Sequence, residues 1–420
     1  MLAVLYRWAY SLLLYLFIPF ELLRLKSRGR KAPDYNKRWS ERFAFGLKKL
    51  PWQEGGIWVH TVSVGETIAA IPIIKALQAS NPELSILVTT MTPTGSERVR
   101  ASLKDTVTHC YAPYDLPDAV GRFLRSFKPS QLLIMETELW PNIINGCYQR
   151  GIPIGLMNAR LSQKSAAGYA KFSRLTESML DKLTFIAAQD SADAERFISL
   201  GADKAKTHVT GNVKFDIEIS NDVLDAGEKL RESMPAPFVW VAGSTHEGEE
   251  TILLEAHKKL LEKVPEAQLI LVPRHPERFD AVFKLIQSTG LAVSRRSLAE
   301  APSRTVYLAD TMGELLISYS AGDVAFVGGS LIERGGHNML EPAALEKALL
   351  LGPSNFNFAH IASKLTEQGG AVIAGSADEL YQQLLEWQDG EKRQVVASKA
   401  VIVVTENRGA LSKLIRLIEG

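Results

Sequence analysis

The sequence predicts an α/β protein in which an N-terminal membrane-anchor helix is followed by two Rossmann-like domains. From Trp58 onward, short apolar runs alternate with helical patterns, which is typical of a parallel sheet with helices on both faces. A polar segment that closes on Pro235 and Pro237 interrupts this alternation, which then restarts. The chain has 420 residues, of which 46% are hydrophobic and 23% charged, so it is long enough to form two domain cores.

These breaks predict the organisation of the chain. A membrane anchor (1–25) and a basic juxtamembrane segment (26–50) precede an N-terminal Rossmann-like domain (51–217). A linker (218–237) leads to a C-terminal Rossmann-like domain (238–394). The remaining residues (395–420) are expected to form helices that pack back toward the first domain.

The apolar segment Leu2–Leu23 is long enough to cross a bilayer, which takes about 20 apolar residues in a helix. It has no small-residue cleavage site, and Trp8 and Tyr10 are typical of interfacial aromatic residues. We expect an uncleaved anchor, although a helix in the interface plane and a core helix remain alternatives. The basic residues that follow predict that the rest of the chain stays on the cytoplasmic side, where they can hold anionic lipid head groups. They are Arg24, Lys26, Arg28, Arg30, Lys31, Lys37, Arg38, Arg42, Lys48 and Lys49.

The cysteine and metal-ligand patterns are sparse. Cys110 and Cys147 are the only cysteines, which fits a reducing compartment and excludes a disulfide scaffold. No Cys pair, His-x-x-x-His or Asp-x-Asp occurs, so we expect no metal site. We expect His246 and the glutamates after it, Glu247, Glu249 and Glu250, to form a solvated helix start.

The expected elements follow in order along the chain. In the first domain the strands are 57–61, 84–90, 107–111, 131–135, 152–157 and 185–188, and the helices are 67–79, one starting near 96, 118–127 and 167–183. In the second domain the strands are 238–242, 268–272, 305–308 and 324–327, and the helices are 249–263, 279–288 and 313–320. The segment 395–419 is helical around a break at 407–409.

Candidate site residues in the first domain follow predicted strands. Glu66 lies where a strand leads into a helix, at the sheet edge where α/β proteins bind ligands and where a carboxylate can accept a proton from a substrate hydroxyl. Glu136 and Glu138 follow the strand 131–135, and at least one of them is expected to be functional. Lys214 is expected near the hinge, where it can stabilise a negatively charged leaving group. The structural alternatives are that the glutamates complement or cap a helix start and that Lys214 is an ordinary surface lysine.

In the second domain, the candidate residues suit a phosphate. Arg274 follows the strand 268–272, where its guanidinium can hold phosphate oxygens, and His275 is expected to orient that loop. Glycine pairs flank the loop before Asn338, which is expected to open a helix facing a phosphate, with Glu341 accepting hydrogen bonds from ribose hydroxyls. Asn338 and Glu341 also have the spacing of a capping box, and both interpretations can hold together.

The ordered set of motifs HTVSVGE, METELWP, NARLS, GNVKFD, AGSTHEGE, VPRHPER, DTMGEL and GGHNMLEPAA resembles the 3-deoxy-D-manno-octulosonic acid (Kdo) transferases of Gram-negative bacteria. The resemblance covers nearly the whole chain, anchor included. It implies a GT-B glycosyltransferase, with two Rossmann-like domains facing a cleft, that transfers Kdo from CMP-Kdo to the lipid A precursor lipid IVA with inversion.

The resemblance also implies roles for individual residues. Glu66 would be the general base, with Glu136 and Lys214 as transition-state stabilisers. The CMP site would comprise Pro273, Arg274, Met312, Gly313, Glu314, Asn338, Met339, Leu340 and Glu341. Because a carboxylate is a weak base for a sugar hydroxyl, we expect burial to raise the pKa of Glu66. No cofactor, metal or nucleic acid is expected, and the implied location is the cytoplasmic side of the inner membrane.

Two alternatives stay open. One is another nucleotide-sugar-dependent GT-B glycosyltransferase that acts on a membrane lipid, such as a UDP-dependent enzyme. The other is a non-catalytic membrane protein that only binds nucleotide or lipid. Substituting Glu66 separates an enzyme from a binding protein, because only the enzyme would lose turnover.

Overall fold

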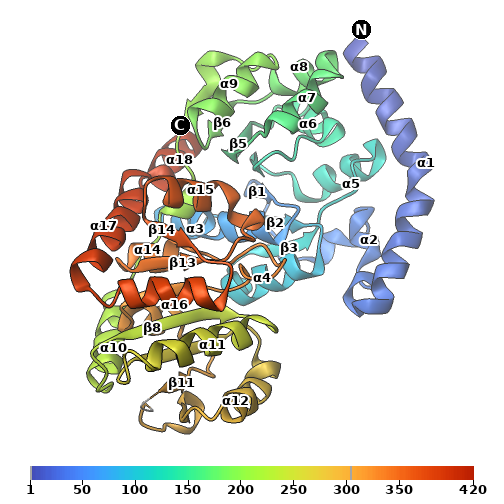
Figure 1. The fold of residues 1–420 in the computed structure, drawn as a ribbon. Helices are drawn as coiled ribbons and strands as arrows, with labels where there is room; N and C mark the ends of the chain where they lie inside the picture. The colour runs from blue at the N-terminus through green and yellow to red at the C-terminus, as the bar shows by residue number, and fades with distance from the viewer. Residues whose placement is uncertain (1, 303–304) are drawn as a thin grey trace. The chain divides into compact units, whose positions relative to one another are not determined.

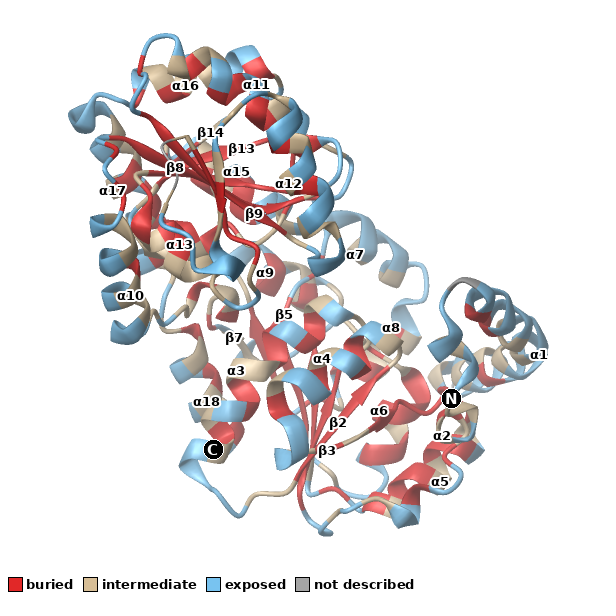
Figure 2. Ribbon diagram, turned by 90° about the horizontal axis from the view of Figure 1, so that it is seen from below, coloured by how far each residue is buried: buried red, intermediate tan, exposed pale blue. Residues whose placement is uncertain are grey.

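The computed structural model describes residues 2–302 and 305–420, which form two compact units (Figure 1). The first unit comprises Met1–Lys214 with Arg408–Gly420, and the second comprises Phe215–Asn407. Each unit contains a seven-stranded sheet with parallel pairing. The strands of both sheets are largely buried (Figure 2), as expected when helices cover both faces.

The first sheet has the strand order β3-β2-β1-β4-β5-β6-β7. The chain starts at β1, moves outward through β2 and β3, and then continues on the other side of β1 from β4, so the direction switches between β1 and β4. The carboxyl ends of the strands beside such a switch are the usual place for a ligand in α/β proteins. The strands are β1 Ile57–His60, β2 Ile86–Thr90, β3 Thr108–Tyr111, β4 Gln131–Met135, β5 Ile154–Ala159, β6 Phe185–Ala188 and β7 Thr207–Val209.

Helices cover both faces of this sheet and form two hydrophobic cores with it. They are α3 Val64–Ser80, α4 Pro93–Leu103, α5 Pro117–Phe127, α6 Pro141–Tyr148, α7 Gln163–Ala170, α8 Ser173–Leu180 and α9 Ser191–Ser199. The late helix α18, Ala410–Glu419, also belongs to this unit and packs against α3 through the buried Ala410, Leu414 and Ile418. The first unit is therefore completed by residues from the far end of the chain.

The second sheet has the order β10-β11-β9-β8-β12-β13-β14 and switches direction between β8 and β12. Its strands are β8 Val239–Thr245, β9 Gln268–Pro273, β10 Val293–Arg295, β11 Val306–Leu308, β12 Val324–Val327, β13 Ala348–Leu351 and β14 Ala371–Ile373. The helices are α10 Asn221–Glu232, α11 Glu249–Leu261, α12 Phe279–Ser288, α13 Leu315–Ala321, α14 Leu340–Ala344, α15 Ala359–Glu367, α16 Ala377–Glu386 and α17 Gly390–Glu406. A hydrophobic core lies on each face of this sheet.

Several elements differ from the sequence-based expectation. The segment 218–237 contains the helix α10, which packs so closely on α13 that a Cβ at Gly227 would overlap Ser320. Its polar composition and the closing prolines favour a linker, whereas the packing on α13 stabilises a helix. The expected helix 167–183 is divided into α7 and α8. Of the C-terminal helices, α17 lies in the second unit and α18 in the first. The strands β7, β10, β13 and β14 were not expected.

The N-terminal helix α1, Leu2–Lys31, lies along the rest of the first unit, with the side chains of Arg7 and Ser11 turned toward it. The guanidinium of Arg7 donates to Asn142 Oδ1 at 3.1 Å, and the Asn142 amide donates to Ser11 Oγ at 2.9 Å. Further along, Leu25 is buried in a small apolar cluster with Tyr114 and Leu116. The large side chains of the opposite face are exposed, and they include Leu5, Trp8, Leu12, Leu16, Phe20 and Leu23. Within the described residues, α1 is the one helix long and apolar enough to cross a membrane.

Candidate active site

Glu66 is positioned by the start of α3, directly after β1. Ser63 is the N-cap residue, and its hydroxyl accepts a hydrogen bond from the Glu66 backbone N–H at 3.2 Å. The Glu66 carboxylate in turn accepts from the backbone N–H of Val62 at 2.8 Å and of Ser63 at 3.2 Å. This is a capping box, which satisfies backbone donors at the helix start. Glu66 therefore does cap the start of a helix, as the structural alternative predicted, and this capping fixes its carboxylate at the carboxyl end of β1.

The environment of Glu66 raises its pKa to about 7 from the ordinary value of 4.5. Burial is the main cause, since the residue is only 6% exposed. The carboxylates of Glu138 and Glu136 add to the rise, whereas the hydrogen bonds from Ser63 and Val62 lower the pKa by less in total. The raised pKa was expected from the sequence. It gives a carboxyl group that changes charge near neutral pH, which suits a general base.

Glu136 follows β4, on the other side of the direction switch from Glu66. Its backbone has a φ of 54°, in the left-handed region that costs energy for a residue with a Cβ. Its carboxylate forms an ion pair with Lys214, with Nζ and Oε1 3.6 Å apart and both side chains about one quarter exposed. The structure therefore brings together two residues that are far apart in the sequence, and both belong to the first unit.

Glu138, the other acid of this loop, has a structural partner. Its carboxylate accepts a hydrogen bond from the indole N–H of Trp140 at 2.8 Å. Burial raises the pKa of Glu138, while this hydrogen bond lowers it by less. Trp140 also packs edge-on against His60 of β1, with ring centroids 4.8 Å apart. Glu138 thus joins the loop to the core beside Glu66.

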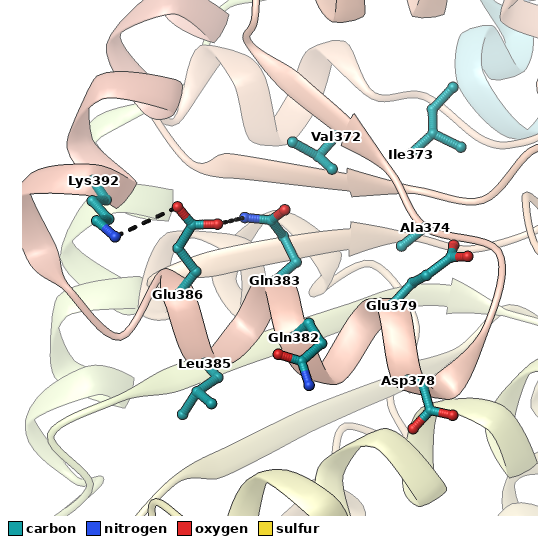
Figure 3. A pocket seen from close by; sticks show the side chains of 10 residues that line it. All are labelled: Val372, Ile373, Ala374, Asp378, Glu379, Gln382, Gln383, Leu385, Glu386 and Lys392. Atoms are coloured by element: carbon teal, nitrogen blue, oxygen red, sulfur yellow. Dashed lines mark hydrogen bonds and ion pairs between the residues drawn. The ribbon is translucent and has the colours of Figure 1, made fainter.

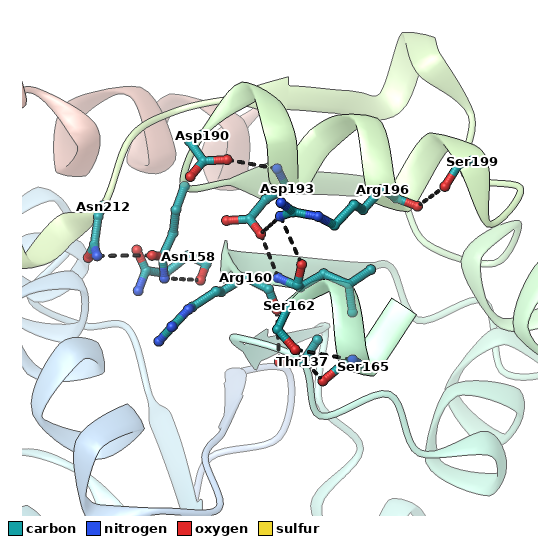
Figure 4. A network of polar contacts seen from close by, with 12 residues as sticks. Thr137, Asn158, Arg160, Ser162, Ser165, Asp190, Asp193, Arg196, Ser199 and Asn212 are labelled. Carbon is teal, nitrogen blue, oxygen red and sulfur yellow. Dashed lines mark hydrogen bonds and ion pairs between the residues drawn. The ribbon is translucent and has the colours of Figure 1, made fainter. Parts of the chain in front are cut away.

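A polar network holds the loop after β5, next to the Glu136 loop (Figure 4). Thr137 donates to the carbonyl of Arg160 at 2.9 Å, and Asp193 accepts from the backbone N–H of Leu161 at 2.8 Å. Buried Asn158 accepts from the backbone N–H of Val213 at 3.1 Å and so ties this loop to the turn that carries Lys214. The network leaves the Arg160 side chain exposed. Lys214 is therefore held in place by hydrogen bonds of its own unit.

In the second unit, Arg274 follows β9, whose last residue is Pro273. The Arg274 backbone N–H donates to the carbonyl of Thr245 at 2.9 Å, and its half-buried guanidinium lies near Glu341. Burial raises the pKa of Glu341, while the Asn338 amide and the Arg274 guanidinium lower it by less. The structure thus brings Arg274 close to Glu341, two residues of the expected CMP site that lie far apart in the sequence.

The segment from Asn338 to Glu341 does not form the expected capping box. The Asn338 amide donates to Glu341 Oε1 at 3.0 Å and Asn338 Oδ1 accepts from the Leu340 backbone N–H at 3.2 Å, while Met339 is the N-cap residue. The helix that follows, α14, has only five residues, too few for a useful helix dipole. The interpretation of a helix N-terminus facing a phosphate therefore has no support here.

The loop between β12 and α14 is instead held by Glu249. This carboxylate accepts from the backbone N–H of Gly329 at 2.7 Å, Ser330 at 3.1 Å and Leu331 at 3.0 Å. Its neighbour Glu250 forms a two-pronged ion pair with Arg278, at 2.6 and 3.1 Å. Both glutamates are fully buried, so the expectation of a solvated helix start is wrong for them. Their partners lie tens of residues away in the sequence, and the acidic run itself indicates only a helix start.

The remaining expected residues, Met312 to Glu314, lie in the loop before α13. Glu314 forms an ion pair with Arg296 at 3.1 Å, Met312 is 58% exposed, and Gly313 has a φ of 86°. None of the expected site residues lines the hollow of about 600 Å³ beside β14 and α16, whose walls include Glu379, Glu386 and Lys392 (Figure 3). Within residues 2–302 and 305–420, no three His, Cys, Asp or Glu side chains are placed to hold a metal ion.

Comparison with known structures identifies the fold. MurG of Acinetobacter baumannii matches with a TM-score of 0.57 and 13% identity, covering 87% of this chain and 99% of that one. A glycosyltransferase from Rickettsia africae matches with a TM-score of 0.54 and 13% identity, covering 87% and 98%. At identities this low, the similarity establishes the fold and nothing about function. The chain has the GT-B fold of two Rossmann-like domains.

Sequence comparison identifies the family. The family model described as 3-deoxy-D-manno-octulosonic-acid transferase (kdotransferase) matches residues 37–217. The 3-deoxy-D-manno-octulosonic acid transferase of Haemophilus influenzae is 41% identical over 421 residues, which cover 99% of this chain and 98% of that protein. The chain belongs to the 3-deoxy-D-manno-octulosonic acid transferase family of glycosyltransferases.

Proposed function

We propose that this protein transfers Kdo from CMP-Kdo to lipid IVA, with inversion at the anomeric carbon and Glu66 as general base. The observation that carries the proposal is a buried carboxyl group with a pKa of about 7, next to the Glu136–Lys214 ion pair at the direction switch of the first sheet. Family membership supplies the transferred sugar. The donor nucleotide, the acceptor and the stereochemistry are part of the proposal.

In the proposed reaction, Glu66 accepts the proton of an acceptor hydroxyl. The oxygen of that hydroxyl forms a bond to the anomeric carbon while the bond from this carbon to the CMP phosphate breaks, and CMP leaves with the electron pair. Lys214 supplies positive charge near the reacting groups, and Glu136 holds the ammonium group in place. The capping box keeps the Glu66 carboxylate in one orientation throughout.

The second unit would bind the donor. Arg274 would hold the phosphate, and Pro273 and Met312 to Glu314 would contact the nucleotide. Asn338 and Glu341 are half-buried and already joined by a hydrogen bond, and they would accept hydrogen bonds from the ribose hydroxyls. The residues from Asn338 to Glu341 supply these contacts through side chains, since their short helix offers no dipole of use.

We further propose that α1 attaches the enzyme to the cytoplasmic face of the inner membrane by lying in the interface. Its contacts with the first unit extend from Arg7 to Leu25, about 27 Å along a helix, which is nearly the thickness of the hydrocarbon layer. A membrane-crossing α1 would carry the polar surface beside it into hydrocarbon, which is costly. The exposed basic side chains at its end, among them Arg24 and Arg28, would contact anionic lipids.

The test is incubation of the purified full-length protein with CMP-Kdo and tetra-acylated lipid IVA, with the products identified by mass spectrometry. The expected result is a product heavier by one or more Kdo residues, formed by the wild type and lost in Glu66→Gln. If product formed with a UDP-sugar and not with CMP-Kdo, the proposal that CMP-Kdo is the donor would be wrong. Binding of CMP without any product from lipid IVA would overturn the acceptor.

A further inference from the structure

Two histidines of the second unit form a hydrogen-bonded pair at the direction switch of its sheet. His246 follows β8, and His337 lies in the loop between β12 and α14. Their Nε2 atoms are 2.7 Å apart and their rings are nearly parallel, at 9°. Gly329 lies against the pair, and a Cβ there would come within 3.1 Å of His337 Cδ2, which is closer than an ordinary contact. The pair occupies the same topological position in the second sheet that Glu66 and Glu136 occupy in the first.

The hydrogen bond limits how many protons the pair can hold. At this distance one Nε2 must carry a hydrogen and the other must present a lone pair. The two rings therefore hold either two protons, and are neutral, or three, and carry a single positive charge. A doubly charged pair would place two N–H groups against each other. The pair can thus gain one proton and no more while its geometry is kept.

Without a ligand, the surroundings keep the pair neutral. Burial, followed by the positive charges of neighbouring groups, lowers the pKa of each histidine to about 4. Arg274 and His275 face both rings, and Arg278 and Arg334 also face His246. Glu249 accepts from the backbone N–H of His246 and is occupied by three further backbone donors, while Glu250 is paired with Arg278. The balance of charge around the rings is therefore positive, and it is suited to an anion.

We propose that the His246–His337 pair takes up one proton from solvent when the phosphate of CMP binds, and so matches the charge that CMP gains as it leaves the sugar. The phosphodiester of a CMP-sugar carries one negative charge, whereas the phosphomonoester of CMP carries nearly two at neutral pH, since its second pKa is about 6. A neutral pair suits the first state and a singly charged pair suits the second. The inference rests on the proposed CMP-sugar donor.

The test is calorimetric titration of the full-length protein with CMP at pH 7, in buffers of different ionisation enthalpy. The dependence of the observed heat on buffer gives the number of protons taken up. We expect about one proton per CMP for the wild type and none for cytidine, which lacks the phosphate. In His337→Asn the uptake should vanish and the affinity for CMP should fall about tenfold. His275→Asn, which leaves the pair intact, should keep the uptake.

The outcomes separate this inference from the proposed donor. CMP binding without proton uptake, or with undiminished uptake in His337→Asn, would overturn the role of the pair and leave the donor standing. Failure of the wild type to bind CMP would overturn both. If His337→Asn does not fold, His246→Asn, which removes the other partner of the hydrogen bond, provides the same comparison.

Discussion

The Glu66 carboxylate caps the start of α3 and, in our proposal, is also the general base. Substitutions at Ser63 and at Glu66 can separate these two roles. Ser63→Ala removes the serine half of the capping box and keeps the carboxylate, so it should lower the free energy of unfolding by about 0.5–2 kcal/mol with little change in kcat. Glu66→Gln keeps a side chain that can still accept one backbone hydrogen bond but removes the base. It should lower kcat by about 10²–10⁴-fold. Denaturant unfolding and product formation, measured on both variants, check this pair of predictions; equal losses of activity would show that only the helix start matters.

The raised pKa of Glu66 has two consequences for pH dependence. Because the base must be ionised, kcat/KM should rise with pH up to about pH 7 and then level off. The unfolded chain loses this proton near pH 4.5 and the folded chain near pH 7. The contribution of Glu66 to folding stability should therefore decrease as the pH rises from 4.5 to 7. A pH–rate profile and unfolding at several pH values measure the two effects. A profile that is flat between about pH 5.5 and 8, on both sides of the Glu66 pKa of about 7, would contradict the first.

The sequence predicts more of the site residues in the first unit than of the contacts in the second unit. Glu66 and Glu136 stand out because each follows a buried strand, and strand ends meet at one edge of a parallel sheet. Lys214 stands out by its place before the expected linker, because β7, the strand that precedes it, is short and only partly buried. The burial of Glu249 and the pairing of His246 with His337 are set by contacts across about 80–90 positions, where no local pattern operates. The left-handed backbone of Glu136 is likewise a property of the folded loop.

Among the elements, α1 gives a prediction because its two faces differ. Replacing Leu12, Leu16 and Phe20 with serine changes only exposed side chains and should abolish binding to anionic vesicles with little effect on Tm. Leu25→Ala is the matched control, since this buried side chain packs on the first unit. It should cost about 2–5 kcal/mol of stability and leave vesicle binding of the folded protein intact. Vesicle flotation and thermal unfolding distinguish the two; flotation of the triple variant would exclude the apolar face as the anchor.

The strands that the sequence did not indicate are short or ambiguous. β7, β10 and β14 have three residues each, which is too few for a two-residue alternation to be recognised. β13 is a continuous apolar run that reads equally well as part of a helix. These strands exist because a neighbouring strand supplies their hydrogen bonds. Position in the sheet does not decide which strands are predictable, since the edge strand β3 was expected and the interior strand β13 was not.

For the molecule as a whole, the chain enters the second unit after Lys214 and leaves it before Arg408. Ending the chain at Asn407 should therefore destabilise the first unit, which loses the buried side chains of α18, by several kcal/mol. The second unit should be unaffected although the cut adjoins it. Hydrogen exchange measured by mass spectrometry checks this: faster exchange in α3, with β8 and β9 unchanged, is expected. Faster exchange confined to the second unit would refute it.

The return of α18 to the first unit also bears on how the protein is made. On the ribosome, the residues of the first unit appear early but lack a helix that covers α3 until about 200 further residues have been added, roughly 10–40 s later. The second unit, although synthesised later, can complete its core before the first does. During that interval the apolar surface of α3 is open to chaperones, while α1 has already emerged and can reach the membrane.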